Sequence, residues 1–494
     1  MKLRPTPLFH LLLIATTWGA STATAQVVLV KPYIQPGNGS SLATGDVKVI
    51  RWLTDQVPGD FAVEYGVKDK PLATVKPERT SLDFGLPAAD AKTNPAIPEN
   101  EQHYFRYAVT LPNLPLDAQM QYRVKLGATI VRESAFRTRA SRAMPVKFVM
   151  VGDLADGKAF QNEVADRISR SRPDFMVVLG DIVYPLGRVS QYMDHFWSTY
   201  CNVENASAAT GAPLMASMLL YPALGNHDVA ARLAQYPDAL GAYHFFDVPT
   251  NGPGEGPWLP PMGSDKAAQA AFRTMAGAAF PALGFYSFDD GPAHILVLDS
   301  SDYVAAGAPK LVEWIERDLK GTDAPWKFVC FHSPAFHTSQ QHFTEQKMRL
   351  LEPIFERCGV DVVFAGHVHN YQRSKPLHFT PTDPTKREPR GTVSGAFKID
   401  QAFDGAANTH PDGIIHIVSG GGGANLYVTN DKTIDAVKKE NPPSWAPFTA
   451  RYFSGAHCFA LVELTPVKFH LRTLTLKGDE VDQITIDKPG TVKP

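Results

Sequence analysis

One stretch decides the fold of this 494-residue chain: Val177-Val178-Leu179-Gly180-Asp181-Ile182-Val183-Tyr184. It begins with an apolar run, which is typical of a strand covered on both faces. It ends in a glycine, a carboxylate and a phenol. Because α/β sheets bind ligands beyond the carboxyl ends of their strands, the stretch predicts a buried strand that ends in potential ligands.

The same pattern occurs four more times between residues 146 and 371. Each time an apolar run ends in side chains that can bind a metal, at Gly152-Asp153, Gly225-Asn226-His227-Asp228, His332-Ser333-Pro334 and Gly366-His367-Val368-His369. Helical patterns lie between these runs, at 159–169, 309–319 and 345–357. Strands that alternate with helices predict a layered α/β domain, with sheets flanked by helices, over residues 143–494.

Residues 26–142 show a different pattern. Short runs of β-branched, aromatic and other apolar residues recur between Pro, Asn and Gly breaks, at 47–52, 61–65, 104–111 and 122–126. Short strands with turn signals over this length predict an all-β sandwich of the immunoglobulin or fibronectin kind.

The rest of the chain adds strands and long connections. The tail returns to β structure at 413–419, 458–464 and 468–476, whereas 248–263 and 379–413 are rich in loop-forming residues and read as long surface loops. The glycine run 420–423 is either a flexible turn or the rim of a pocket, since no Walker motif follows it.

The first 25 residues are typical of a secretory signal. Lys2 and Arg4 precede an apolar core at 8–14, and Ala23-Thr24-Ala25 has the small-x-small pattern that signal peptidases recognise. We expect cleavage after Ala25 and a periplasmic or secreted protein. The alternatives are a membrane anchor, which the short apolar core disfavours, and an ordinary buried helix.

Composition excludes several classes of protein. Lys and Arg number 48 against 50 Asp and Glu, so the net charge of −2 gives no support to nucleic-acid binding. No apolar run reaches the roughly 20 residues that span a bilayer, so no membrane partner is expected. The four cysteines form no CxxC motif, which disfavours a zinc knuckle or a redox site. Their pairing is left open, although Cys330 reads as a buried free thiol.

The side chains at the five strand ends suit a pair of metal ions. Two cations about 3.5–4 Å apart need a bridging anion, and the carboxylate of Asp181 can bind both. The other donors are oxygens and imidazoles without thiolate, which favours Fe, Zn or Mn. They are Asp153, Tyr184, Asn226, His332, His367 and His369. Any one of them alone is more often structural, so the inference depends on the whole set.

The order GD, GDxxY, GNHD, HSP and GHVH resembles the calcineurin-like metallophosphoesterases, and specifically the purple acid phosphatases. That group also carries a fibronectin-like domain before the catalytic one, so the resemblance covers most of the mature chain. Pro32-Tyr33-Ile34-Gln35 is similar to its opening segment. Ala155 departs slightly from the glycine usual there, and Tyr184 occupies the tyrosine position.

The resemblance implies which residues hold which ion. Fe(III), which a hard tyrosinate donor favours, would be bound by Asp153, Asp181, Tyr184 and His369. A second ion, Fe(II), Zn or Mn, would be bound by Asp181, Asn226, His332 and His367.

The resemblance also implies the substrate-binding residues. His227 matches a histidine that contacts substrate phosphate, next to Asn226. A second such histidine lies ten residues after His332, which gives His342. His337 is a rival for that role, and its plainer interpretation is a solvent-facing loop residue. Asp228 is expected to orient His227.

The implied function is a secreted dinuclear acid phosphatase. It would hydrolyse small-molecule phosphomonoesters by attack of a metal-bound hydroxide, with His227 and His342 neutralising charge and His342 protonating the leaving group. One alternative is a phosphodiesterase or nucleotide pyrophosphatase on the same metal site. These enzymes differ in their pocket walls, supplied here by 186–224, 229–284 and 379–413, and the sequence of these segments does not indicate the substrate. The other is a binding protein with a vestigial site, which the complete ligand set disfavours. The oligomeric state is left open.

Overall fold

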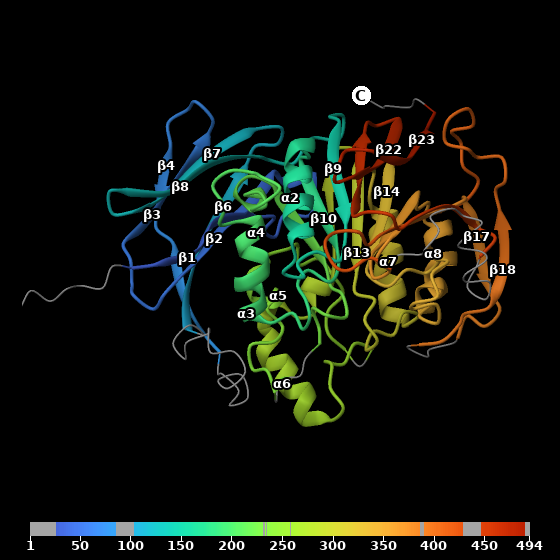
Figure 1. Ribbon diagram of the computed structural model, residues 1–494, viewed down its shortest axis with the longest axis horizontal. Coiled ribbons are helices and arrows are strands. Elements are labelled where there is room, and N and C mark those ends of the chain that lie inside the picture. The colour runs from blue at the N-terminus through green and yellow to red at the C-terminus, as the bar shows by residue number, and fades with distance from the viewer. Residues whose placement is uncertain are drawn as a thin grey trace, which may run out of the picture.

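The computed structural model describes residues 26–84, 103–230, 233, 235–256, 258–385, 390–427 and 446–489. These residues form an all-β part, followed by a larger part that contains the helices and two mixed sheets (Figure 1). The predicted signal segment 1–25 lies outside the described residues. Within the described ranges, no helix is long and apolar enough to cross a membrane.

The N-terminal part has two four-stranded antiparallel sheets. The first has the order β1 (Val28–Gln35), β2 (Asp46–Thr54), β6 (His103–Leu114) and β5 (Glu78–Asp83). The second has the order β4 (Ala73–Val75), β3 (Phe61–Val67), β7 (Gln119–Leu126) and β8 (Thr129–Arg137). Between them Trp52 stacks on Tyr107, with ring centroids 5.3 Å apart, and Phe61 packs against both. The predicted all-β sandwich is confirmed.

The C-terminal part has two larger sheets. The six-stranded sheet has the order β11 (Leu219–Ala223), β10 (Phe175–Leu179), β9 (Val146–Val151), β21 (Cys458–Leu464), β22 (Lys468–Thr475) and β23 (Glu480–Asp487). The seven-stranded sheet has the order β12 (Phe285–Asp290), β13 (Ala293–Leu298), β14 (Trp326–Phe331), β15 (Val362–Ala365), β19 (Ile415–Ser419), β16 (Tyr371–Ser374) and β20 (Thr449–Phe453).

The two large sheets pack face to face and present their parallel strands to the same region. The ring of Phe148 on β9 lies 5.8 Å from that of Phe328 on β14, and Sγ of Cys330 lies 4.0 Å from Sδ of Met150. All four cysteines of the chain fall within the described ranges and are buried free thiols, as predicted for Cys330. Strands β9, β10 and β11 run parallel, as do β13, β14, β15 and β19. Their carboxyl ends carry the predicted donors.

Helices flank the two sheets, which confirms the predicted α/β layering. They are α2 (Ala159–Ser171), α3 (Val189–Gln191), a π-helical turn (Tyr192–Trp197), α4 (Ser198–Tyr200), α5 (Ala242–Phe245), α6 (Lys266–Ala276), α7 (Pro309–Gly321) and α8 (Glu352–Arg357). The 3-10 turns are Leu42–Thr44, Leu214–Ala216, Gly277–Ala279, Ala282–Gly284 and Lys347–Leu351.

One predicted helix is wrong in a way that matters for the site. Residues 345–357 form a 3-10 turn followed by the short helix α8, not one continuous helix. Pro353 has no N–H, so it cannot donate the helical bond to the carbonyl of Arg349. Glu345 lies ahead of the 3-10 turn and forms an isolated bridge to Gly391.

The predicted long loops also contain regular structure. The region 379–413 contains most of a hairpin, formed by β17 (Leu377–Pro381) and β18 (Gly395–Ile399) at the edge of the molecule (Figure 1). Strand β11 and several short helices lie within 186–224 and 229–284. Polar residues such as Thr380 and Lys398 alternate along the hairpin, so its strands contain no apolar run and the sequence did not indicate them.

A buried ionic cluster joins the sandwich to the larger C-terminal part. Asp46 accepts from Nε of Arg139 at 2.9 Å and from Nζ of Lys48 at 2.5 Å, and all three side chains are fully buried. Arg139 also donates to the carbonyl of Asp289 at 3.3 Å, and Ala140 N donates to Asp290 Oδ1 at 2.7 Å. The expected boundary between residues 142 and 143 follows this link directly, and it stays a prediction.

Candidate metal centre

The candidate donors lie at the carboxyl ends of five parallel strands. Asp153 follows β9, Asp181 and Tyr184 follow β10, and Asn226 follows β11. His332 follows β14, and His367 and His369 follow β15. Short polar contacts join all seven side chains into one continuous network.

One group of donors surrounds the phenol oxygen of Tyr184. Its Oη lies 2.8 Å from Oδ1 of Asp153, 3.1 Å from Oδ2 of Asp181 and 3.1 Å from Nε2 of His369. Nε2 of His369 in turn lies 3.2 Å from Oδ1 of Asp153. These are the four side chains expected to hold the first ion.

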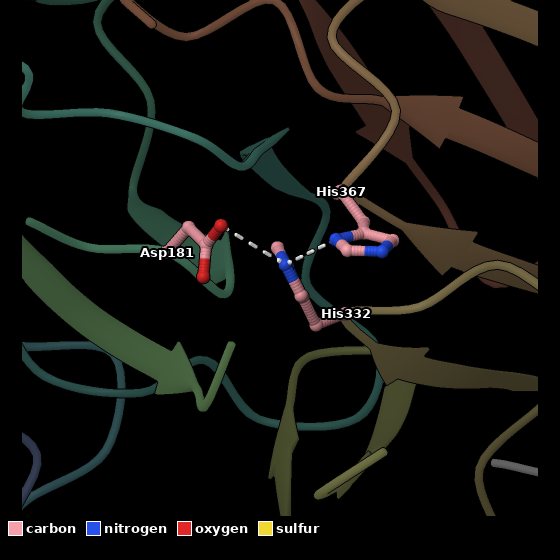
Figure 2. Close-up of side chains that lie close together, drawn as sticks. All are labelled: Asp181, His332 and His367. Atoms are coloured by element: carbon pink, nitrogen blue, oxygen red, sulfur yellow. Dashed lines mark hydrogen bonds and ion pairs between the residues drawn. The ribbon is translucent and has the colours of Figure 1, made fainter. Parts of the chain in front are cut away.

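A second group surrounds Nε2 of His332. That atom lies 3.2 Å from Oδ2 of Asp181, 3.1 Å from Oδ1 of Asn226 and 3.1 Å from Nδ1 of His367. Figure 2 shows His332 between Asp181 and His367, with the three side chains directed toward one another. Oδ2 of Asp181 belongs to both groups, so the two groups meet at this carboxylate.

The far nitrogen of each candidate imidazole has an acceptor that sets its orientation. Nδ1 of His332 faces the carbonyl of Leu179 at 2.7 Å, and Nδ1 of His369 faces that of Asn425 at 2.6 Å. A ring nitrogen that faces a carbonyl oxygen carries a proton, because a carbonyl can only accept. The opposite nitrogen is therefore directed at the centre, as in metal-binding histidines.

The charges in the centre fit bound cations. Burial raises the pKa of Asp181, but the charge of His332 outweighs it and holds that pKa well below its ordinary value. Burial lowers the pKa of His332, but Asp181 outweighs it and raises that pKa to about 10. Burial and the charges of Asp153 and Asp181 raise the pKa of Tyr184 well above its ordinary value.

The charges of these buried side chains also show whether the residues present suit metal ions. Within the described ranges, neither Asp153 nor Asp181 forms an ion pair with a lysine or arginine. The protons on His332 and His369 offset the two buried carboxylates, and the hydroxyl proton of Tyr184 is donated to Asp153. Metal ions would replace these protons, so the donor set and its charge both fit two cations.

Four residues of the site have an unusual backbone conformation. Asp153, Asp181, His342 and His367 have φ values of 62°, 50°, 62° and 67°. Positive φ costs a residue with a side chain about 1–3 kcal/mol, and it persists where the surrounding fold imposes it. Nine non-glycine residues of the described ranges have positive φ, and four of these nine lie at the site.

Asp228 supports the site in a different way from the one expected. Its carboxylate accepts from the backbone N–H of Gly225 at 2.9 Å and from that of Ile182 at 3.0 Å. The ring of His227 is instead oriented by the carbonyl of Pro185, which lies 2.6 Å from its Nδ1. Gly225 itself is required, because a Cβ there would lie 2.1 Å from Oδ1 of Asp181.

The two candidate substrate histidines flank the centre. Nε2 of His227 lies 3.8 Å from Oδ2 of Asp181, and about a third of the side chain is exposed. The ring of His342 lies 3.8 Å from that of His367, measured between centroids. Both rings are therefore next to the donors and accessible from outside.

His337 does not face the centre, and its interpretation as a solvent-facing residue is also wrong. It is 2% exposed, with Nε2 3.3 Å from the carbonyl of His342 and Nδ1 accepting from Ser339 N at 3.3 Å. Burial and the charge of His367 lower its pKa to about 3. Its contacts support the loop that carries His342.

The sequence analysis did not identify two side chains of the site. Glu345 contacts both His342 and His367, and Tyr427 lies between His342 and His369. The position of Glu345, three residues after His342, was the available signal for the first. The glycine run was the signal for the second, since a Cβ at Gly420 would lie 2.3 Å from the carbonyl of Val368. This close approach favours the pocket-rim interpretation of that run.

Comparison with known proteins agrees with the geometry. The family described as calcineurin-like phosphoesterase matches residues 146–371. Purple acid phosphatase 21 of Arabidopsis thaliana is 26% identical over 275 residues, covering 55% of this chain and 54% of that protein. Fe(3+)-Zn(2+) purple acid phosphatase 12 of the same plant is 23% identical over 338 residues, covering 67% and 62%.

A solved structure extends the likeness over most of the fold. Purple acid phosphatase PPD1 from yellow lupin (Lupinus luteus) seeds superposes with a TM-score of 0.62 at 17% identity, covering 95% of this chain and 78% of that one. The chain matches about half the length of the first of the two Arabidopsis relatives. Fold, motif order and relatives agree: residues 146–371 match the calcineurin-like phosphoesterases, and the chain is similar to the purple acid phosphatases.

Proposed function

We propose that the protein is a dinuclear-metal acid phosphatase that hydrolyses phosphomonoesters of small molecules. One observation carries the proposal: seven oxygen and nitrogen donors form two groups that share Oδ2 of Asp181. Phosphoesterases that use two metals need such a shared carboxylate to hold the ions close together.

Each group is assigned one ion. Asp153, Asp181, Tyr184 and His369 would hold Fe(III), and Asp181, Asn226, His332 and His367 would hold Fe(II), Zn or Mn. The iron and zinc in the name of the Arabidopsis relative, Fe(3+)-Zn(2+) purple acid phosphatase 12, support this pairing. When bound, the two ions supply Lewis acidity and activate a water molecule at acidic pH.

The chain's own residues bind the phosphate group and move the proton. His227 holds its Nδ1 proton against the carbonyl of Pro185, so the second proton of the doubly protonated ring lies on Nε2 and can be donated to a phosphate oxygen. His342 is held at Nδ1 by Glu345, and its doubly protonated ring would give the Nε2 proton to the leaving oxygen. Asn226 lies beside both His332 and His227 and would contact the same phosphate.

Hydrolysis of two chromogenic substrates tests the proposal. Protein supplied with iron and zinc should hydrolyse p-nitrophenyl phosphate at acidic pH, and it should hydrolyse bis(p-nitrophenyl) phosphate far more slowly. Asp181→Asn should bind fewer ions by elemental analysis and lose activity on both. A preference for the diester would instead identify a phosphodiesterase. Inactivity of protein that holds two ions would identify a binding protein.

We also propose that the protein is exported and cleaved after Ala25, and that residues 26–142 and 143–494 are its two domains. The signal-like composition of the first 25 residues supports export. N-terminal sequencing of the protein recovered from outside the cytoplasm should begin at Gln26. Recovery with an intact Met1 would contradict the proposal.

A further inference from the structure

The carboxylate of Glu345 lies between two imidazoles of the site. Oε1 is 3.2 Å from Nδ1 of His342, and Oε2 is 2.8 Å from Nε2 of His367. Glu345 is held in place by its own backbone, whose N–H donates to the carbonyl of His342 at 2.9 Å. Its side chain is 17% exposed, so water competes little for its oxygens.

The other imidazoles of the centre do not depend on a side chain in this way. His332, His369 and His227 are oriented by the backbone carbonyls of Leu179, Asn425 and Pro185. A backbone carbonyl stays in place when a side chain is replaced. The rings of His342 and His367 instead have a side-chain acceptor, and it is the same one.

The two contacts fix where each ring carries its proton. A carboxylate only accepts, so it holds a proton on Nε2 of His367 and another on Nδ1 of His342. Nδ1 of His367 is then left with its lone pair directed at the second group of donors, 3.1 Å from Nε2 of His332. Nε2 of His342 is left to face the hydroxyl of Tyr427 at 3.1 Å.

We propose that Glu345 is a positioning residue that sets the orientation and proton placement of both His367 and His342. It thereby links the second metal site to the histidine that faces the phosphate. The two rings lie 3.8 Å apart between centroids, so a displacement of the shared carboxylate moves both. This inference rests on the proposed function in assigning a metal to His367 and a proton transfer to His342.

Glutamine is the informative replacement, because it keeps the shape of Glu345 and one of its two acceptors. Its amide nitrogen donates, so it opposes the proton on one of the two rings. Loss of such a supporting contact costs about 10- to 100-fold in metal affinity or activity. We expect Glu345→Gln to weaken zinc binding and to lower kcat at saturating zinc by factors in that range, with KM changed much less.

Glu352→Gln is the matched control. Glu352 is buried and accepts from Nε2 of His416 at 2.9 Å, but neither residue contacts a candidate ligand among the contacts described. It should lower the melting temperature and leave zinc affinity and kcat at their wild-type values. If both glutamine variants lose affinity equally, the effect is one of general stability, and the proposal is overturned.

The same substitution in a His342→Ala variant separates the two roles of Glu345, which are to orient His367 and to orient His342. In His342→Ala, the added Glu345→Gln change should still weaken zinc binding, because His367 remains. It should no longer lower kcat, because the ring that it oriented has gone. Equal effects on kcat in both backgrounds would contradict the positioning of His342.

Nitrogen-15 shifts of the histidine rings give a readout that needs neither metal nor activity. In metal-free wild-type protein, His367 should be protonated at Nε2, and Glu345→Gln should change the shifts of His342 or His367. Unchanged shifts would overturn the proposal.

A wild type that binds two ions without hydrolysing any monoester would instead overturn the proposed function, while the shifts and zinc affinity still decide the role of Glu345. A third ion per chain that Glu345→Gln removes would make Glu345 a ligand and overturn its positioning role.

Discussion

The ring of Tyr427 lies parallel to the ring of His369, with 4.4 Å between centroids and 10° between planes. Its hydroxyl lies 3.1 Å from Nε2 of His342, and its backbone N–H donates to the carbonyl of His369 at 2.9 Å. One side chain therefore contacts both a candidate iron ligand and the candidate proton donor. The two contacts use different parts of the residue, so they can be removed separately.

Tyr427→Phe should keep the stacked ring and lose only the hydroxyl. A neutral hydrogen bond contributes about 1 kcal/mol, so we expect kcat to fall about fivefold with metal content unchanged. Tyr427→Ala should also lower the iron content, because His369 loses its packing. Tyr33→Phe is the control, since it removes a hydrogen bond to the carbonyl of Phe245 far from the centre. An unchanged kcat in Tyr427→Phe would show that the hydroxyl does not orient His342.

The phenol of Tyr184 predicts a coloured protein. A tyrosinate bound to Fe(III) gives a visible charge-transfer band, and Tyr184→Phe should lose it. The variant should retain the second ion, since Tyr184 lies in the first group of donors only. Absorption spectra with elemental analysis of both proteins test this. A colourless wild type that is fully active with only zinc or manganese would reject the iron assignment and leave hydrolysis intact.

Strand ends made the candidate donors predictable. Val177-Val178-Leu179 is apolar throughout because both of its faces are covered, and the donors follow at its carboxyl end, where parallel strands place their ligands. The sandwich was predictable for a similar reason, since its strands have their own β-branched and aromatic pattern. These parts of the fold depend on patterns that are local in the sequence.

Glu345 and Tyr427 were not predictable in the same way. Both lie on irregular segments, where no periodicity indicates the direction of a side chain. Glu345 lies at the start of a helical pattern that Pro353 interrupts, so the sequence did not indicate its contacts with the site. The contact between Tyr427 and His369 joins residues far apart in the chain and depends on the path of the glycine run. Such contacts follow from the tertiary fold.

The stability of the catalytic part should fall at alkaline pH because of His294. Burial lowers the pKa of His294, but its bonds to Asp289 at 2.8 Å and Asp318 at 2.9 Å outweigh this and raise it to about 9. A raised pKa contributes stability that is complete below about pH 6.5 and is lost as pH rises through about 9. The contribution is on the order of 3 kcal/mol.

Urea unfolding of His294→Gln at several pH values tests this. The variant should be less stable than wild type at pH 6, and the difference should shrink by pH 9.5. His470→Gln is the comparison, since that ring bonds to the hydroxyl of Thr485 instead of a carboxylate. A difference between wild type and His294→Gln that stays constant with pH would show that the two aspartates do not hold a charged ring.

The buried cluster at Asp46 should couple the unfolding of the two parts of the protein. Asp46→Asn leaves Lys48 and Arg139 buried without a full countercharge, and breaking one partner of a buried pair costs about 3–5 kcal/mol. The double variant Asp46→Leu with Lys48→Met also removes the charge of Lys48 and leaves only Arg139 without a countercharge, so it should recover part of that loss. Because Arg139 also bonds the carbonyl of Asp289, wild-type protein should unfold in one transition in urea. Two transitions in wild type, or a double variant less stable than Asp46→Asn, would contradict this coupling.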